Sequence, residues 1–443
     1  MSIVWSAPRE AAAQFISGWG EVSPLASEVW PSLTPSTTEN TIVAIPPDRT
    51  GCGSDGGVII ARGDKANGAL VSANTLRCAS SSPACITMTS DLRTAHGIPP
   101  GVEDHFEETS HNDIARLNDG TVLIARSLVR YSPAAPSNRR GMVAFFSSND
   151  CGGSWQEASQ LDPASIPGTD DFGQGILYAD PWSSRVYYVV RNNPTPTFVF
   201  VSTDGGYSWS DPFPIGASDS GYRVTSMPSG TTYFLGTFQT TTELYQYEPG
   251  GEPSFLDFGV RDVATGLGQI GDIGISRVGQ LPDGDYLRIV YPVRLSPSNQ
   301  VALRYEVVQV ANGSAFSMRS SNITGTGHIV GATFVDTDRF ELPTAAVENG
   351  ALLYWQEQSC VGGGPGYQMN GKLVRDLDNW TAPLVIDSKS TDCGGFGANP
   401  PVNPQGDFGR GAFVYDPSLR TLDFLAHWTD LSPTSGSTPG SAV

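Results

Sequence analysis

The chain lacks the features that mark several common classes of protein. No apolar run approaches the roughly 18 to 20 residues that cross a bilayer, and no window joins low hydrophobicity to dense charge. Charged residues make up only 16% of the 443 residues, and 26 basic residues face 45 acidic ones, a formal net charge of −19. Because the basic residues are scattered, a phosphate backbone would be repelled. We therefore expect no membrane span, no general disorder and no nucleic-acid partner.

Metal-ligand spacing is missing as well. The six cysteines form no Cys-x-x-Cys pair, and the five histidines show no zinc-ligand spacing. An even number of cysteines and three Asn-x-Ser/Thr sequons, at Asn312, Asn322 and Asn379, suit an oxidising, secreted setting. The first residues do not resemble a signal peptide, so either the sequence given starts at a mature end or the protein is intracellular. We expect a secreted protein in which Cys78 pairs with Cys85 and Cys360 with Cys393, each pair within one loop-rich stretch.

Turn residues are abundant, with 50 Gly and 33 Pro. A short β-rich run, a tight turn and a second β-rich run recur seven times, with turns from residue 57 to residue 417 that are on average 60 residues apart. That period fits a four-stranded propeller blade with its loops. The predicted hairpins pair residues 41–45 with 58–62, 113–117 with 121–126, 175–178 with 185–191, 222–225 with 232–235, 272–276 with 286–291, 342–347 with 351–355, and 411–414 with 422–426.

The hairpins predict an all-β chain with a seven-bladed β-propeller as its single domain, residues 1–431. Residues 2–5 read as an orphan strand, and the last hairpin leaves its blade incomplete, so we expect the N-terminal strand to close the ring. Residues 432–443 are rich in Ser, Pro and Gly and are expected to form a flexible tail.

A second pattern, Ser-x-Asp-x-Gly-x-Ser-Trp, lies between hairpins at residues 148–155 and again at 202–209, 54 residues later. Residues 89–96 carry a degenerate third copy, which keeps only part of the pattern. The pattern resembles the Asp box, or BNR repeat, of the sialidase-like β-propellers. There we expect the Asp to accept backbone N–H bonds in the turn between strands three and four, with Gly at positive φ and Trp between sheets. These residues are expected to be structural.

Charged groups gather at the ends of the predicted hairpins. Where each first strand begins, acidic and polar residues would ring one central mouth, and neighbouring carboxylates raise one another's pKa as a general acid requires. Where the second strands end, five of seven hairpins place a cation suited to binding a carboxylate. The alternative to a functional role is a structural one, in which the acidic residues cap turns and the cations lie at solvent-exposed strand ends. The entrance residues are His111, Asp113, Asp171, Tyr222, Arg223, Asp272, Glu341 and Asp407, and the exit residues are Arg62, Arg126, Arg130, Tyr131, Arg191, Arg294 and His427.

His111 stands out as a candidate base, because Asn112 and Asp113 could fix its tautomer. The resemblance implies the propeller fold but not sialidase activity: where sialidases carry Arg-Ile-Pro, this chain reads Ala44-Ile45-Pro46. Seven repeats are more similar to seven-bladed polysaccharide lyases and related glycoside hydrolases that act beside uronic acids. Those enzymes use a funnel His with Tyr and Arg, which by blade position implies His111, Tyr131 or Tyr178, and Arg126 or Arg191.

Two classes of function remain at this point. The first is a carbohydrate-active enzyme that cleaves a glycosidic bond in or next to an acidic sugar, by hydrolysis or β-elimination, and acts as a monomer. The second is a non-catalytic, lectin-like glycan-binding propeller. A lectin would repeat one pocket in each blade, whereas this ring mixes His, Asp, Glu, Tyr and Arg, which favours the enzyme. No cofactor is expected with certainty, and the sequence does not decide whether the acids hold a calcium ion.

Overall fold

The computed structural model consists of antiparallel β-strands, and η2 (Pro163–Ser165) is the one helical element among the residues it describes. Side chains are described mainly between residues 113 and 323. The structure describes residues 41–45, 57–66, 69–78, 85–88, 105–132, 135–166, 172–192, 196–216, 222–238, 241–257, 273–296, 300–323, 328–336, 351–358, 367–374, 384–389, 412–416, 421–425, 428–429 and 441–442.

The first four sheets, sheets 1 to 4, each contain four strands that pair in chain order. Their strands are β1 (Thr41–Ile45), β2 (Gly57–Ala66), β3 (Ala69–Cys78) and β4 (Cys85–Met88) in sheet 1; β5 (His105–Arg116), β6 (Val122–Ser132), β7 (Ala135–Ser148) and β8 (Gln156–Leu161) in sheet 2; β9 (Phe172–Ala179), β10 (Val186–Asn192), β11 (Thr197–Ser202) and β12 (Phe213–Ile215) in sheet 3; and β13 (Arg223–Ser226), β14 (Thr232–Phe238), β15 (Thr241–Tyr247) and β16 (Ser254–Leu256) in sheet 4.

Two further four-stranded sheets and two strand pairs follow. Their strands are β17 (Gly274–Leu281), β18 (Gly284–Leu295), β19 (Gln300–Ala311) and β20 (Ser314–Ile323) in sheet 5; β21 (His328–Asp336), β22 (Ala351–Gln358), β23 (Tyr367–Val374) and β24 (Leu384–Lys389) in sheet 6; then the hairpin of β25 (Ala412–Asp416) with β26 (Thr421–Leu425), and the pair of β27 (Trp428–Thr429) with β28 (Ser441–Ala442).

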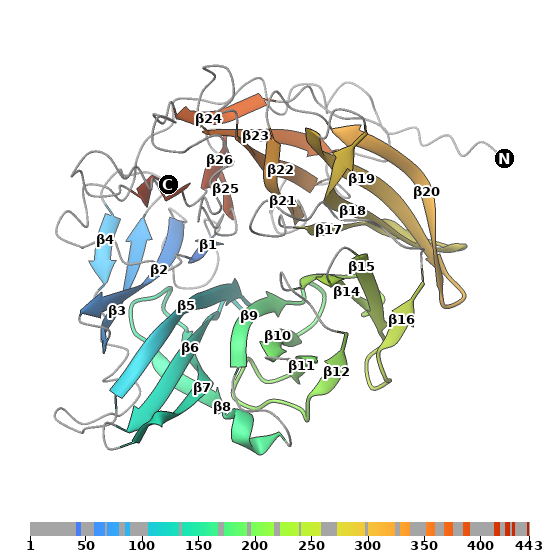
Figure 1. Ribbon diagram of the computed structural model, residues 1–443. Helices are drawn as coiled ribbons and strands as arrows, with labels where there is room; N and C mark the ends of the chain where they lie inside the picture. The colour runs from blue at the N-terminus through green and yellow to red at the C-terminus, as the bar shows by residue number, and fades with distance from the viewer. Residues whose placement is uncertain are drawn as a thin grey trace.

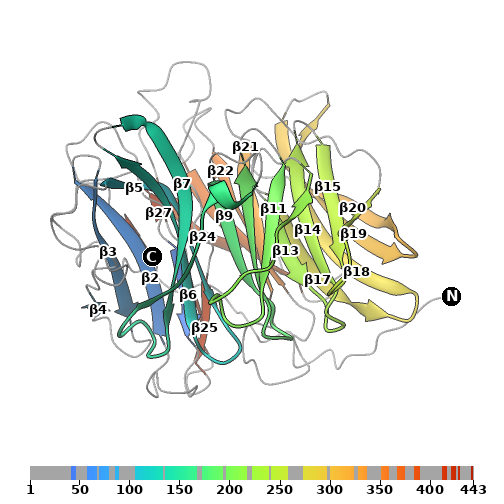
Figure 2. The ribbon, with the colours of Figure 1, turned by 90° about the horizontal axis from the view of Figure 1, so that it is seen from below.

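The sheets surround a common centre, as in a β-propeller (Figure 1). Seen from the side, the strands of successive sheets stand next to one another (Figure 2). The first strands of neighbouring sheets contact each other: β1 touches β5, β5 touches β9, β13 touches β17, and β17 touches β21. The last hairpin returns to the first sheet, because β25 contacts β1 and β2.

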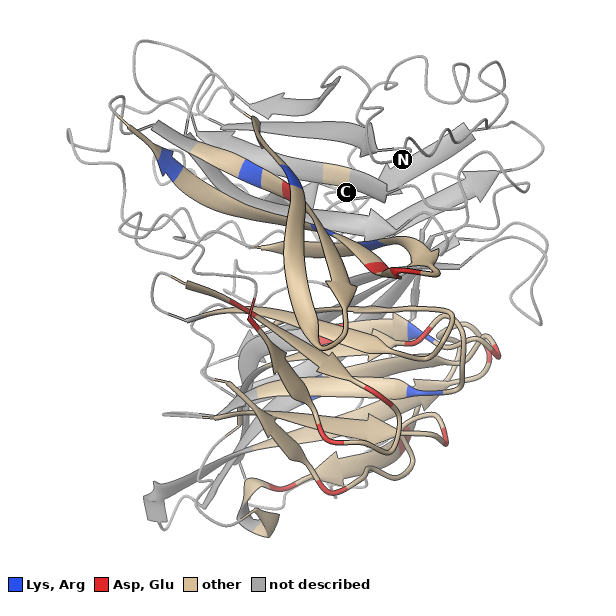
Figure 3. Cartoon of the chain, turned by 90° about the vertical axis from the view of Figure 1, so that its right-hand side faces the viewer, with Lys and Arg blue, Asp and Glu red and all other residues tan. Residues whose placement is uncertain are grey.

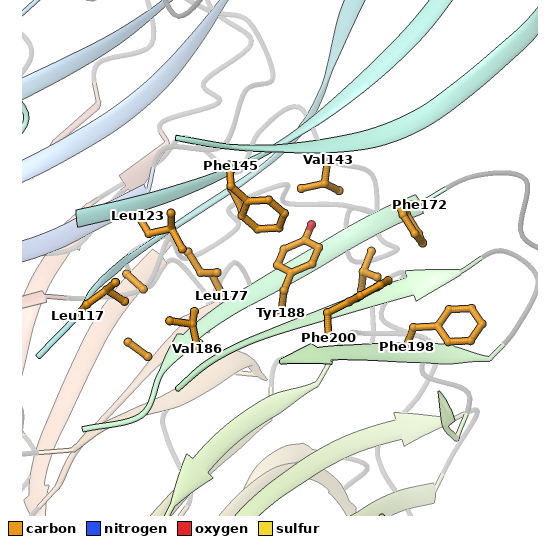
Figure 4. Close-up of a cluster of buried hydrophobic side chains, with 14 residues drawn as sticks. Leu117, Leu123, Val143, Phe145, Phe172, Leu177, Val186, Tyr188, Phe198 and Phe200 are labelled. Carbon is orange, nitrogen blue, oxygen red and sulfur yellow. The ribbon is translucent and has the colours of Figure 1, made fainter. Parts of the chain in front are cut away.

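The core consists of apolar layers between neighbouring sheets. In the layer between sheets 2 and 3, Phe145 of sheet 2 packs edge-on against Tyr188 of sheet 3 at 5.1 Å between ring centroids. Phe172 packs against Phe200 within sheet 3 (Figure 4). Similar layers join sheet 3 to sheet 4, sheet 4 to sheet 5, and sheet 5 to Leu353 of sheet 6. Strands covered on both faces cannot alternate between apolar and polar residues, which explains their continuous apolar runs.

The two Ser-x-Asp-x-Gly-x-Ser-Trp turns have the same hydrogen bonds. In residues 148–155, Asp150 accepts the backbone N–H of Ser154 at 2.7 Å and the hydroxyls of Ser148 and Ser154, each at 2.8 Å. In residues 202–209, Asp204 accepts the equivalent three bonds at 2.9, 2.8 and 2.5 Å. Gly152 and Gly206 both have positive φ, 84° and 91°, which glycine adopts without steric cost. As expected, these turns join the third and fourth strands of sheets 2 and 3.

Six of the seven predicted hairpins are confirmed by their strand pairing. The sixth is wrong, because β22 pairs with β21 at residues 328–336 and not with residues 342–347. The run from His328 to Val335 is rich in β-branched and aromatic residues, whereas Pro343 lacks the N–H that a ladder needs. The second strand of the second hairpin is longer than predicted, because β6 continues to Ser132 and pairs with β7.

The all-β class and the four-stranded antiparallel unit are confirmed where the structure describes the chain. Seven complete blades and closure by residues 2–5 stay predictions, since residues 2–5 lie outside the described residues and the seventh unit appears as the hairpin β25–β26. Within the predicted tail, Ser441–Ala442 pairs with Trp428–Thr429. The degenerate third copy, residues 89–96, lies outside the described residues and follows β4 instead of joining a third strand to a fourth.

Candidate functional site

Two residues predicted to be catalytic connect the innermost strands of neighbouring sheets. Asp113 on β5 is 5% exposed, and its carboxylate accepts the backbone N–H of Leu177 on β9 at 2.6 Å and that of Ile114 at 2.9 Å. Tyr178 on β9 is also buried, and its hydroxyl accepts the N–H of Ser226 on β13 at 2.9 Å. Each of the two side chains therefore binds a backbone amide on the first strand of the next sheet.

Arg126 lies on the other face of sheet 2 from Asp113. Asp113 is opposite Ala125 in the β5–β6 register, and successive residues of a strand point to opposite faces, so Arg126 faces away from Asp113. Its side chain is 1% exposed. The structure therefore does not bring this arginine and this carboxylate into one site.

Apart from Tyr222 and Arg223, the remaining predicted residues fall into three groups. Arg294 is exposed near the end of β18. Arg62 on β2, His111 on β5, Arg130 and Tyr131 on β6 and Arg191 on β10 are placed as backbone only, with Tyr131 opposite His105 and Arg191 opposite Thr197. The residues that lie outside the described part of the chain are Asp171, Asp272, Glu341, Asp407 and His427.

Tyr222 and Arg223, predicted at the entrance of the fourth hairpin, lie beside a carboxyl group that the sequence did not indicate. The hydroxyl of Tyr222 is 3.5 Å from Oε2 of Glu243 on β15, and the hydroxyl of Tyr245 is 3.4 Å from the same oxygen. The two tyrosine rings meet edge to face, 6.3 Å apart. Arg223, half-buried, donates through Nη1 to the carbonyl of Tyr222 at 3.4 Å. Glu243, Tyr222 and Tyr245 are called the Glu243 cluster below.

Two glycines leave room for the Glu243 cluster. A Cβ on Gly236 of β14 would overlap the ring of Tyr222, which lies across that strand on its way to Glu243. A Cβ on Gly216, just after β12 of sheet 3, would overlap Oε2 of Glu243 and the hydroxyl of Tyr245. The cluster therefore sits where sheets 3 and 4 meet, at the end of the array at which first strands begin.

Burial controls the protonation of this cluster. Removal from water raises the pKa of Glu243, and the hydrogen bonds from Tyr245 and Tyr222 only partly oppose that rise. Burial, followed by the charge of Glu243, raises the pKa of Tyr245 to about 12 and raises that of Tyr222 as well. The tyrosines thus stay protonated, and the carboxyl of Glu243 holds its proton to a higher pH than an ordinary glutamate.

The geometry of the Glu243 cluster suits proton donation. Both hydroxyl contacts are longer than the about 2.7 Å usual between two oxygens, so they restrain the carboxyl weakly. Both also fall on Oε2, and no described residue hydrogen-bonds to Oε1. A half-buried acid with a raised pKa can protonate a leaving oxygen at a higher pH than an ordinary glutamate.

Sequence reasoning missed Glu243 and Tyr245 because it considered only the ends of first and second strands. Both residues belong to a third strand, two positions apart, so they share one face of β15. A Glu-x-Tyr pair opposite a glycine-bearing strand was the available signal. Only the register of β13, β14 and β15 within sheet 4, with the ring of Tyr222 lying over Gly236, shows that the pair meets Tyr222.

The described residues contain neither a metal-binding group nor a membrane-spanning helix. Among them, no group of three or more His, Cys, Asp or Glu side chains could hold a metal ion. Calcium binding by the predicted ring of acids is not tested, because most of those acids lie outside the described residues. No described helix is long and apolar enough to cross a membrane.

No family model and no curated protein matches the chain. Among solved structures, it is similar to the NanB sialidase of Streptococcus pneumoniae, with 10% identity, 80% of this chain and 70% of that chain covered, and a TM-score of 0.45. It is also similar to an alpha-L-arabinofuranosidase of Fusarium graminearum, with 10% identity, coverages of 77% and 96%, and a TM-score of 0.42. An alpha-L-arabinanase of Penicillium chrysogenum is similar with 12% identity, 72% of this chain and 94% of that chain covered, and a TM-score of 0.38. Similarity at this level does not assign the chain to a family.

Proposed function

We propose that this chain is a carbohydrate-active enzyme of the sialidase-like β-propeller superfamily, and that it cleaves a glycosidic bond in or next to an acidic sugar. The two Ser-x-Asp-x-Gly-x-Ser-Trp turns are proposed to be its Asp boxes. The observation that carries the enzymatic proposal is the Glu243 cluster, a half-buried carboxyl with a raised pKa at the end of the array where first strands begin.

Glu243 is the proposed general acid. As the glycosidic C–O bond breaks, the carboxyl passes its proton to the leaving oxygen and becomes a carboxylate, to which the hydroxyls of Tyr222 and Tyr245 then donate. In hydrolysis, water supplies the hydroxyl group that the other sugar receives and returns a proton. In β-elimination, a base such as His111 removes the C5 proton of a uronate, and a double bond forms between C4 and C5.

The acidic character of the substrate is proposed from the cations at this end of the array. Arg223 adjoins the Glu243 cluster, and Arg294 is exposed near the end of β18. Guanidinium groups bind carboxylates in a bidentate manner, and a nearby cation also makes a uronate C5 proton more acidic. Arg126, Arg130 and Arg191 remain candidates by sequence position. A secreted, monomeric enzyme is part of the same proposal.

The test compares Glu243→Gln with wild type on polygalacturonate, alginate, hyaluronan and chondroitin sulfate. New reducing ends report any cleavage, and ultraviolet absorbance of an unsaturated uronate identifies elimination. Gln keeps the shape and an acceptor for both tyrosines but has no acidic proton, so we expect kcat to fall by about 10²-fold or more. Glu248→Gln is the matched control, because Glu248 follows the far end of β15 and accepts bonds from Thr231 and Gln246.

Gly216→Ala provides a second test that changes no polar group. Its methyl group would displace Oε2 of Glu243, so we expect cleavage to fall while the protein still folds. Full activity of a folded Glu243→Gln variant would refute the assignment of the acid. Tight binding of one of these glycans without any cleavage would favour the lectin-like alternative.

A further inference from the structure

A tryptophan is held on a rigid turn at the opposite end of the array. The turn joins β9 to β10, and the N–H of Asp180 bonds to the carbonyl of Arg185 at 2.9 Å. The carboxylate of Asp180 accepts the N–H of Trp182 at 3.0 Å and the hydroxyl of Ser183 at 2.5 Å. The backbone on both sides of Trp182 is therefore fixed.

The neighbouring sheet fixes this turn from outside. The side-chain amide of Asn118, in the β5–β6 turn of sheet 2, donates to the carbonyl of Ser183 at 2.8 Å and to that of Asp180 at 3.2 Å. Bonds to two carbonyls on either side of Trp182 prevent the turn from rotating. A side chain presented on such a turn loses little conformational entropy when it binds a ligand.

Despite this rigid support, the side chain of Trp182 is 43% exposed. The guanidinium carbon of Arg277, on β17, lies 4.3 Å from the centroid of the Trp182 ring, so a cation covers part of the ring. Trp182 belongs to sheet 3 and Arg277 to sheet 5, and sheet 4 lies between them in the array. The contact therefore passes along the inner side of the array, at the end where first strands turn into second strands.

Exposed carboxylates lie in other turns at this end of the array. Asp119 lies in the same turn as Asn118, and Asp283 lies in the β17–β18 turn of the sheet that carries Arg277. Figure 3 shows that acidic residues mark several of the turns, whereas many basic residues lie within strands. Carboxylates hydrogen-bond to sugar hydroxyls but repel an anionic sugar.

We propose that Trp182 is the stacking platform of a second glycan-binding site, and that this site takes a neutral pyranose. The C–H face of the sugar packs on the exposed part of the indole, which supplies a large apolar surface. Asp119 and Asp283 accept bonds from its hydroxyl groups, as the few polar groups of a small-molecule site do. The site lies at the opposite end of the first strands from the Glu243 cluster, so it would hold a neutral portion of a glycan away from the proposed site of cleavage.

The test is calorimetric titration of the full chain with cellohexaose, xylohexaose and mannohexaose. We expect at least one of them to bind, and its Kd to rise about tenfold or more in Trp182→Ala. Trp182→Phe keeps a smaller ring and should give an intermediate Kd, which also covers the case in which the alanine variant does not fold. Phe316→Ala is the matched control, since Phe316 on β20 is an aromatic residue with 54% exposure and should leave Kd unchanged.

Binding of a neutral hexasaccharide does not depend on cleavage, so the outcome is separate from that for Glu243. Absence of binding to all three sugars would overturn the proposal. So would a folded Trp182→Ala or Trp182→Phe variant with a lower melting temperature and an unchanged Kd, because Trp182 would then serve only the contact with Arg277. Trigalacturonate is titrated as the acidic comparison. If Trp182→Ala weakens the binding of trigalacturonate and of none of the neutral sugars, the neutral class is overturned.

Discussion

The hydroxyl of Tyr233 donates a 2.7 Å hydrogen bond to Oδ2 of Asp285, across the boundary between sheets 4 and 5. Both side chains are buried. Burial raises the pKa of Asp285, while hydrogen bonds from Tyr233 and Gln280 oppose the rise. A carboxyl whose pKa is higher in the folded than in the unfolded state favours folding below its unfolded pKa. That contribution is lost as the pH rises through the folded pKa.

Asp285→Asn should remove this dependence. In wild type, we expect the free energy of unfolding to decline as the pH rises from the ordinary aspartate value of 3.8 through the raised pKa. Urea denaturation at a series of pH values measures the decline, which should be smaller in the Asn variant. Asp211→Asn, at an exposed position, is the control. Parallel curves for wild type and Asp285→Asn would contradict the prediction.

Tyr245→Phe should move the pH profile of cleavage. The hydroxyl of Tyr245 lowers the pKa of Glu243, so its removal raises that pKa further. A general acid must be protonated, and cleavage therefore falls as the pH rises through its pKa. We expect the alkaline limb of the kcat profile to shift to higher pH. Tyr247→Phe, on the same strand, should leave it in place, and an acid-ward shift in Tyr245→Phe would count against Glu243 as the acid.

Asp113→Asn separates a structural from a catalytic aspartate. Asn has one carbonyl oxygen for the two amides that Asp113 binds, so one backbone N–H loses its acceptor. We expect a loss of about 2 kcal/mol in the free energy of unfolding, with kcat per folded molecule retained. Urea denaturation and the cleavage assay measure the two effects. A stable but inactive variant would restore Asp113 to the catalytic role predicted from its position.

Trp209→Ala should destabilise the protein strongly. The ring of Trp209 lies 4.5 Å from that of Phe145 and 6.2 Å from that of Tyr188, and its Nε1 donates to the hydroxyl of Ser159 at 2.9 Å. We expect a loss of about 3 kcal/mol, at the lower end for a buried aromatic because Trp209 is only half-buried. Trp209→Phe, which loses the hydrogen bond but keeps a ring, should cost about 1 kcal/mol. Equal losses in both variants would show that the hydrogen bond dominates.

Non-reducing peptide mapping should find Cys78 bonded to Cys85. The two lie directly opposite each other in the β3–β4 register. Directly opposed residues have Cα atoms about 4.5 to 5.5 Å apart, within the range that a disulfide spans. Cys151, which is disulfide-bonded, should yield no free thiol. A bond from Cys78 to any other cysteine would contradict the pairing.

Local chemistry made much of the fold predictable. The turns of the second and fourth predicted hairpins show why: Gly120 and Gly230 have positive φ, 92° and 93°, which glycine adopts without steric cost. Turns of this kind and β-rich runs located six of the seven hairpins. The sixth failed because a long connection separates β21 from β22, and a tight turn at Gly350 was assumed.

The candidate site was less predictable, because it depends on how sheets pack on one another. Tyr222 was found from its place at a strand entrance, but its partner Glu243 comes from two strands away and needs the space left by Gly216. Asp113 and Tyr178 were likewise predicted to be catalytic from their positions in the hairpins. Their binding of amides in the next sheet depends on the register between sheets, which no local pattern encodes.

The connections made by Asp113 and Tyr178 have an evolutionary consequence. A carboxylate and a phenol do the same task, because what each must supply is one acceptor oxygen within reach of a backbone amide of the next sheet. The amide is present whatever the residue that bears it. Selection at such joints acts on reach and acceptor chemistry rather than on residue type. Descendants of a common ancestor could therefore exchange aspartate for tyrosine there, and a comparison of residue types would score the preserved joint as a difference.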